Sequence, residues 1–270
     1  MSYWSDKVVL ITGASSGLGL HLARAWFQAG ARVVLVARDA ERLRAAANSL
    51  SPDSERCLAI PCDVTQDEAV KKLIEQVQSR YGRLDVLVNC AGASTRGKIA
   101  ETKLAEFQWN WDLNVLAMVR CIQATLPMLT ATRGHIVNIG SLAGKVGARY
   151  VGPYSATKHA VTGLSQQLRL ELEPAGVHVL HVCPGPIRDE RTASRYDSET
   201  MEKLPAAAHQ PGAGAKIRGI DPVWLAKKIV TATERRKREL IVPWKANILL
   251  LAGVISTRLG DWLLKKMTGG

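Results

Sequence analysis

Short apolar runs alternate along the chain with longer stretches in which apolar residues recur every three or four positions. The short runs are rich in β-branched residues and almost continuously apolar, a pattern typical of strands buried on both faces. The longer stretches have the period of amphipathic helices. This pattern predicts strands at 7–11, 32–37, 57–61, 86–89, 135–139, 178–183 and 239–243. It predicts helices at 17–29, 39–50, 65–81, 103–130 and 154–172.

Regular alternation of buried strands with helices predicts a single, doubly wound α/β domain, a parallel seven-stranded sheet flanked by helices on both faces. Ligands of such sheets gather at the carboxyl ends of the strands. We expect a catalytic domain at 1–243, in which 188–220 is an insertion that forms a substrate-binding loop or lid. Residues 244–270 form a separate apolar, helical extension.

Composition agrees with one soluble domain, because 47% of the 270 residues are hydrophobic and can fill a sizeable core. The chain enters a strand pattern almost at once, without the features of a secretory signal, so we expect a cytoplasmic protein. Five scattered cysteines, with no C-x-x-C pair, are expected to be reduced. His178 and His181 would point to opposite faces of a strand, and we predict no metal site.

The net charge of +12 is compatible with nucleic acid, an acidic membrane surface or a phosphorylated cofactor. The basic residues do not form one patch, and their densest cluster, 234–240, is typical of a solvated helix end. Basic residues interleaved with aromatics, which nucleic-acid recognition favours, do not occur. We therefore expect no nucleic-acid partner.

Gly13, Gly17 and Gly19 lie between the first predicted strand and the first predicted helix. Glycines at such a turn let the backbone approach a pyrophosphate, and the helix amino terminus attracts the anion. After the second strand, Arg38 occupies the region where NAD sites often carry an acidic residue, and it favours a ribose 2′-phosphate. NADP(H) is therefore the expected cofactor. Arg38 capping the next helix is the alternative, and the neighbouring Asp39 leaves NAD open.

Seven short motifs occur in the order and spacing of a known family: TGASSGLG (12–19), CDV (62–64), NCAG (89–92), LNV (113–115), IGS (139–141), YSATK (154–158) and CPGPI (183–187). In these motifs the sequence resembles the short-chain dehydrogenase/reductase family, over about the first seven-tenths of the chain. The resemblance implies a Rossmann-type fold and a nicotinamide cofactor.

The resemblance assigns Tyr154 as the proton donor to a carbonyl oxygen, a group that must lie within hydrogen-bond reach of it. A phenol has a pKa of ~10, and an ammonium on the same helix face, that of Lys158, stabilises the phenolate. Ser141 would hold the substrate carbonyl, and Asn114 would connect Lys158 through water to solvent. In isolation, each of these residues has a structural explanation, such as a helix pair or a turn.

The resemblance also implies the cofactor contacts. Lys158 would bond the nicotinamide ribose, Asp63 and Val64 the adenine, and Asn89, Ala91 and Gly92 would line the adenosine ribose, whereas Pro184, Gly185 and Ile187 would shape the nicotinamide pocket. The full set is Gly13, Ser15, Ser16, Gly17, Leu18, Gly19, Arg38, Asp63, Val64, Asn89, Ala91, Gly92, Tyr154, Lys158, Pro184, Gly185 and Ile187. Cys90 and Asp189 depart from the family pattern, which has a second asparagine and often a threonine at these places.

The carboxyl-terminal extension has an apolar core, 248–255, that is far shorter than the roughly 20 residues of a membrane span. Trp262 and the basic residues Arg258, Lys265 and Lys266 follow it, a composition that suits a helix in a membrane interface. Packing on the substrate pocket and a contact between subunits are alternatives. Family members acting on lipids often have such a tail, which favours an apolar, lipid-like substrate and leaves peripheral membrane contact open.

These patterns together predict an NADP(H)-dependent oxidoreductase that interconverts a small-molecule carbonyl, a ketone or aldehyde, and an alcohol. The alternative is a non-catalytic NADP(H)-binding redox sensor or scaffold, which would not need a proton relay. An epimerase or dehydratase would usually have a nucleotide-sugar site, and nothing in the tail suggests one. The resemblance further suggests a homodimer or homotetramer formed through the helices that contain Asn114 and Tyr154.

Overall fold

A seven-stranded parallel sheet, in the order β3-β2-β1-β4-β5-β6-β7, forms the centre of the molecule. The computed structural model describes residues 2–50, 55–188, 204–209 and 219–267. The strands are β1 (Val8–Thr12), β2 (Arg32–Ala37), β3 (Cys57–Pro61), β4 (Val86–Asn89), β5 (His135–Ile139), β6 (His178–Pro184) and β7 (Glu239–Val242). The strand order reverses direction between β1 and β4, as in a doubly wound sheet, which confirms the predicted fold class.

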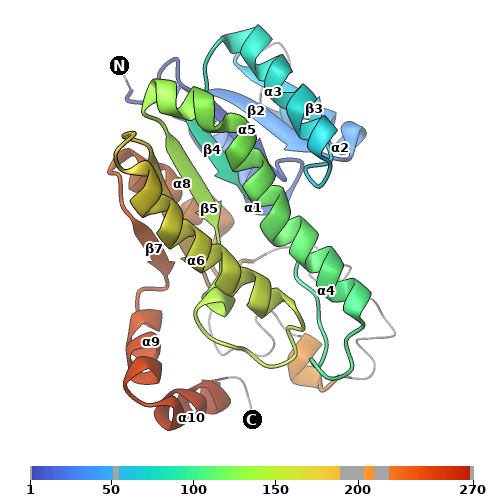
Figure 1. Ribbon diagram of the computed structural model, residues 1–270, viewed down its shortest axis with the longest axis vertical. Coiled ribbons are helices and arrows are strands. Elements are labelled where there is room, and N and C mark those ends of the chain that lie inside the picture. The colour runs from blue at the N-terminus through green and yellow to red at the C-terminus, as the bar shows by residue number, and fades with distance from the viewer. Residues whose placement is uncertain (1, 51–54, 189–203, 210–218, 268–270) are drawn as a thin grey trace.

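Helices cover both faces of this sheet (Figure 1). One core contains Val9 and Ile11 of β1, and the helices packed on it are α1 (Gly17–Gln28), α2 (Ala40–Leu50) and α8 (Pro222–Glu234). The opposite core contains Val8 and Leu10, and its helices are α3 (Asp67–Tyr81), α5 (Ala117–Thr132) and α6 (Tyr154–Leu172). Alternate residues of β1 thus anchor different layers, because successive side chains of a strand point to opposite faces.

The helix predicted at 103–130 is confirmed as one helix from 104 to 132, but its interior contains a π-helical turn that was not predicted. The segment comprises α4 (Leu104–Trp111), a π-helical turn η1 (Asp112–Leu116) and α5. The wider turn surrounds Asn114, whose buried side chain forms hydrogen bonds with the backbone of Ala93. The spacing of apolar residues along a helix does not predict such a tertiary contact. By length and composition the whole stretch from 104 to 132 could cross a membrane, but Met118, Ile122 and Leu129 are buried and belong to a core helix.

The predicted insertion at 188–220 lies largely outside the described residues, and Asp189 is among those not described. Its two ends meet, because Ile187 and Ile220 form a β-bridge. Within it the short helix η4 (Ala206–His209) is described. After β7 the chain continues into α9 (Ala246–Ile255) and α10 (Thr257–Met267), two helices where one extension was predicted.

Candidate active site

The turn between β1 and α1 is a close-packed cradle of glycines. Gly13 and Gly17 have positive φ angles of 69° and 52°, which favour glycine. A Cβ at Gly19 would overlap the carbonyl oxygen of Gly13, and a Cβ at Gly13 would come within 3.0 Å of the Ala91 backbone. The Ser16 side chain makes no capping hydrogen bond to α1. The N–H groups in the first turn of α1 are therefore not capped by Ser16. Such a turn fits a pyrophosphate. Ser15 and Ser16 lie in the turn, and Leu18 lies in the first turn of α1.

Thr12 joins this turn to the loop that follows β4. Its hydroxyl oxygen accepts hydrogen bonds from the backbone N–H groups of Cys90 and Ala91, both at 3.0 Å. The hydroxyl in turn lies 3.3 Å from the carbonyl oxygen of Val88, to which it donates. Thr12 was not predicted as a site residue, although its place directly before Gly13 at a strand end was a usable signal.

Two acidic residues flank Arg38 at the ends of β2 and β3, and their side chains have different partners. Asp39 accepts a hydrogen bond from the backbone N–H of Arg42 and pairs with its guanidinium at 3.2 Å, so Asp39 starts α2. The Asp63 carboxylate accepts from the N–H and hydroxyl of Thr65, at 3.0 and 2.8 Å. Burial acts to raise the pKa of Asp63, but the Thr65 hydrogen bonds and the Arg38 charge outweigh it and lower the pKa. Arg38 itself is exposed.

Tyr154 and Lys158 occupy the first turns of α6, on the same side of the helix. The Lys158 Nζ lies 5.7 Å from the centroid of the Tyr154 ring and donates to the carbonyl oxygen of Ile139 at 2.8 Å. Lys158 is only 6% exposed, and burial lowers its pKa to about 8. The ammonium is thus held at the carboxyl end of β5, one helical turn from the phenol.

Ser141 lies just beyond β5 and caps the short helix η2 (Leu142–Gly144), accepting from the N–H of Ala143 at 3.1 Å. Side chains of α6 hold this helix in place. Ser155 donates to the carbonyl oxygen of Ala143 at 2.7 Å, and Thr162 donates to that of Gly144 at 3.0 Å. The helix that carries Tyr154 therefore also fixes the backbone that carries Ser141.

Asn114 binds the loop after β4 through both atoms of its amide. Its Oδ1 accepts from the N–H of Ala93 and its Nδ2 donates to the carbonyl oxygen of the same residue, each at 2.9 Å. Nδ2 also lies 3.1 Å from the hydroxyl of Thr157 on α6. A Cβ at Gly92 would come within 2.8 Å of Asn114 Oδ1 and 3.7 Å of Lys158 Nζ, so these three residues converge.

A small cavity lies at this convergence. Its volume is about 10 Å³, close to what one water molecule requires. Asn114, Lys158, Thr12, Asn89 and Ile139 are among the residues that line it. Polar groups on several sides give a water the partners that a buried site demands.

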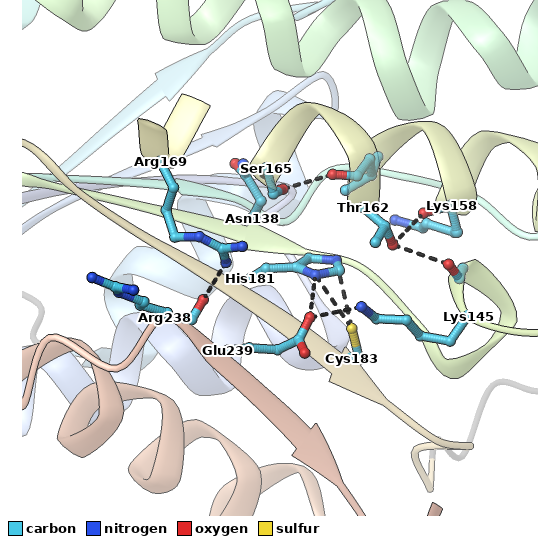
Figure 2. A network of polar contacts seen from close by, with 12 residues as sticks. Asn138, Lys145, Lys158, Thr162, Ser165, Arg169, His181, Cys183, Arg238 and Glu239 are labelled. Carbon is cyan, nitrogen blue, oxygen red and sulfur yellow. Dashed lines mark hydrogen bonds and ion pairs between the residues drawn. The ribbon is translucent and has the colours of Figure 1, made fainter. Parts of the chain in front are cut away.

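A second polar network joins Lys145, the residue after η2, to strands β6 and β7 (Figure 2). His181 of β6 lies 3.1 Å, Nδ1 to Oε1, from Glu239 on β7, and the Lys145 ammonium pairs with the same oxygen at 2.8 Å. The hydrogen bond from His181, which has the largest effect, and that from Lys145 lower the pKa of Glu239 to about 2. Burial lowers the pKa of His181. A Cβ at Gly140 would overlap His181 Nε2, so the ring abuts the residue before Ser141.

Three side chains of this part of the structure are of types that can bind a metal ion, and among the described residues they lie close together. Potential ligand atoms of His181, Cys183 and Glu239 lie within 4.8 Å of one another. The Lys145 ammonium already lies on the Glu239 carboxylate, and burial raises the pKa of the Cys183 thiol to about 12. We interpret the cluster as an ion-pair network, since a buried neutral thiol beside an ammonium is a poor cation ligand.

Residues 7–200 match the family described as short chain dehydrogenase. The chain belongs to this family. An uncharacterized oxidoreductase of Staphylococcus aureus strain MW2 is 38% identical over 205 residues, which are 76% of this chain and 87% of the relative. The ketoacyl reductase HetN of a Nostoc species is 35% identical over 244 residues, 90% of this chain and 80% of that protein.

Solved structures of the family have the same architecture. A short-chain dehydrogenase from Streptomyces avermitilis superposes with a TM-score of 0.81 at 33% identity, covering 98% of both chains. L-sorbose reductase from Gluconobacter frateurii, solved with NADPH and L-sorbose, gives a TM-score of 0.78 at 30% identity and covers 88% of this chain and 95% of the reductase. The chain is thus an oxidoreductase of the short-chain dehydrogenase family.

In this short-chain dehydrogenase the carboxyl edge of the sheet brings the predicted residues together. Ile139, before Ser141, and Asn89 end neighbouring strands, and the Asn89 amide donates to Asn138 at 2.9 Å. Val64 is buried and lines the cavity. Gly185 donates its N–H to the carbonyl oxygen of Val242 at 2.7 Å. Pro184 ends β6 and Ile187 begins the insertion. The network of Lys145, His181 and Glu239 was not predicted, because it forms only when β6 pairs with β7.

Proposed function

We propose that this short-chain dehydrogenase interconverts a ketone or aldehyde and an alcohol, with NADP(H) as its cofactor. The observation that carries the proposal is the Tyr154–Lys158 pair at the carboxyl edge of the sheet, next to the Ser141 loop and the glycine cradle. A bound nicotinamide supplies or accepts the hydride in such a reaction. The Nostoc relative HetN, a ketoacyl reductase, supports carbonyl chemistry.

In the proposed mechanism, the Tyr154 hydroxyl gives its proton to the carbonyl oxygen of the substrate. The Lys158 ammonium one turn away stabilises the phenolate that remains, because an opposite charge favours the ionised form. The Ser141 hydroxyl donates a hydrogen bond to the same substrate oxygen and orients it. A water in the cavity between Asn114 and Lys158 returns the proton toward Tyr154.

The preference for NADP(H) rests on the side chains after β2. The Asp39 carboxylate accepts from the backbone N–H of Arg42 and pairs with its guanidinium, so both of its oxygens already have partners at the start of α2. Arg38 remains exposed and can pair with a 2′-phosphate. The NADPH complex of the L-sorbose reductase supports this choice of cofactor.

The proposed substrate is apolar, and the support is the surface of α9 and α10, where large apolar side chains are exposed beside β7. We further infer that the enzyme acts in the cytoplasm as a homodimer or homotetramer, assembled through α5 and α6. Exposed Leu116, the last residue of η1 before α5, and exposed Leu170 of α6 are available for such a contact. Light scattering tests the assembly: a mass of two or four times 29.3 kDa is expected, and a monomer mass contradicts it.

Substitution of Tyr154 by phenylalanine tests the mechanism. Removing the hydroxyl removes the proton donor, so we expect Tyr154→Phe to lower kcat by at least ~1000-fold in a panel of ketones and aldehydes with NADPH. NADPH binding, followed by fluorescence titration, should change less than ~3-fold. Tyr81→Phe, the same change at the end of α3, is the matched control and should leave kcat unaltered. Near-normal turnover by Tyr154→Phe would refute the mechanism.

A further inference from the structure

We propose that α9 and α10 form a membrane-docking hairpin that places the catalytic edge of the enzyme against an anionic bilayer. Delivery of an apolar substrate from the membrane rests on the proposed function. Docking itself can be measured without turnover. The partner is a lipid surface rich in acidic headgroups, and the contact is interfacial. At ten residues, α9 is too short to cross the hydrocarbon core.

A close glycine contact joins the two helices. A Cβ added to Gly260 would come within 2.7 Å of the Gly253 Cα, so the helix backbones approach where a larger residue would separate them. Ser256 connects them, and its hydroxyl accepts from the N–H of Leu259 at 3.3 Å, as an N-cap of α10. The two helices therefore pack against each other as a helical hairpin.

Large apolar side chains on this hairpin face solvent. Val254 and Ile255 expose 85% and 82% of their surface, and Trp262 exposes 55%. The others of this kind are Ile248, Leu251 and Leu259. On α9 they recur at three- and four-residue spacing, which gives one helix face an apolar stripe. An exposed apolar patch of this kind marks an interaction surface.

Positive charge surrounds the apolar stripe. The segment 245–267 contains four basic residues (Lys245, Arg258, Lys265, Lys266) and one acidic residue, Asp261, for a net charge of +3. The Lys266 ammonium lies 5.2 Å from the Trp262 ring, so cation and indole share one side of α10. Lysine, arginine and tryptophan beside aliphatic residues match the headgroup region of an anionic membrane.

The charge pattern favours lipid over a second copy of the chain. A two-fold symmetric contact would place the hairpin of one subunit against the hairpin of the other. Each would bring the same net charge of +3 to the interface, and like charges facing each other oppose association. Acidic headgroups instead neutralise these residues.

The hairpin lies at the same edge of the sheet as the candidate active site. It follows β7, and because the strands are parallel, the carboxyl end of β7 shares an edge with β1, β4, β5 and β6. The carbonyl oxygen of Val242, the last residue of β7, accepts from Gly185 in the predicted nicotinamide loop. Figure 1 shows α9 and α10 projecting past the end of β7 (red ribbon). A docked hairpin therefore turns this edge toward the membrane, from which an apolar carbonyl compound can enter.

Flotation with vesicles tests the proposal on the full-length protein. With vesicles of phosphatidylcholine and phosphatidylserine we expect the wild type to float, and with phosphatidylcholine alone its apparent affinity should be at least ~10-fold lower. Val254→Glu should weaken binding to the mixed vesicles by at least ~10-fold, because it puts a charge into the apolar stripe. The matched control is Val223→Glu, the same change at an exposed position of α8, which should bind as the wild type does.

A combined Lys265→Glu and Lys266→Glu variant should also weaken binding by at least ~10-fold. The proposal is overturned if the wild type does not float, or if Val254→Glu and Val223→Glu float equally. It is likewise overturned if Val254→Glu converts an oligomer to a monomer with unchanged flotation, which would assign the stripe to a second copy. Turnover of a water-soluble ketone, measured without vesicles, should be the same for all variants and the wild type. If the wild type does not turn over any water-soluble ketone, this result would instead count against the proposed function.

Discussion

The Lys158 side chain is buried, and burial disfavours the charged ammonium form. Its pKa falls from 10.5 to about 8, so between these values the unfolded chain binds more protons than the folded one. Stability of the cofactor-free protein therefore rises with pH across this window through Lys158. Relative to Lys158→Met, the wild type should gain up to ~1.4 kcal/mol of unfolding free energy per pH unit between pH 8 and 10. Urea unfolding at several pH values measures this, with the exposed Lys72→Met as control. A pH-independent difference would show that Lys158 is not perturbed.

Arg38 is the residue on which the cofactor preference depends. Removal of its guanidinium takes away a charge-assisted contact to a 2′-phosphate, and such contacts contribute about 1.5–3 kcal/mol. Arg38→Ala should thus raise the KM for NADPH by ~10- to ~100-fold and leave that for NADH within ~3-fold. Steady-state kinetics with both cofactors measure the two values. Arg44→Ala, on the exposed side of α2, is the control. An equal loss with both cofactors would contradict a 2′-phosphate contact.

At the scale of elements, β6 and β7 hold the Ser141 loop through Lys145, His181 and Glu239. Glu239→Gln removes the charge that pairs with Lys145, so the loop should lose part of its anchor. We expect kcat for a soluble ketone to fall ~10-fold and the KM for the ketone to rise, with NADPH affinity unchanged, because positioning of the substrate is affected. The control is Glu173→Gln, an exposed ion-pair partner of Arg238. A loss of NADPH affinity equal to the loss of kcat would indicate a general loss of structure instead.

The elements differ in how well the sequence predicts them. The strand ranges were found to within one residue at either end, because a strand buried on both faces needs a continuous apolar run, and β2 to β5 match in full. The π-helical turn at Asn114 was not found, since the residue that Asn114 contacts there, Ala93, lies 21 residues earlier in the chain and outside the helical pattern. The same holds for His181 and Glu239, which meet only when β6 pairs with β7. Motif residues were predictable because their chemistry fixes their spacing, whereas the residues that hold them depend on tertiary pairing.

At the scale of the whole molecule, the boundary after β7 separates two kinds of surface. The strands and the inner faces of the helices pack large apolar side chains into two cores. Within α9, in contrast, Ala246 is the buried residue and the larger side chains are partly or fully exposed. The extension thus contributes little apolar burial to the main core, as expected if 1–243 folds as the catalytic domain.

Removal of residues 245–270 tests this division. Few buried side chains are lost, so the free energy of unfolding should fall by no more than ~2 kcal/mol, about the value of one buried apolar side chain. Turnover of a soluble ketone should stay within ~3-fold of the wild type, because the Tyr154, Lys158 and Ser141 contacts lie outside the deleted segment. Denaturant unfolding and kinetics measure both quantities on the truncated chain, and Val254→Glu in the full chain controls for changes in surface charge. A truncated protein that no longer unfolds cooperatively would place α9 within the catalytic domain, where its contact with β7 would then be part of the core.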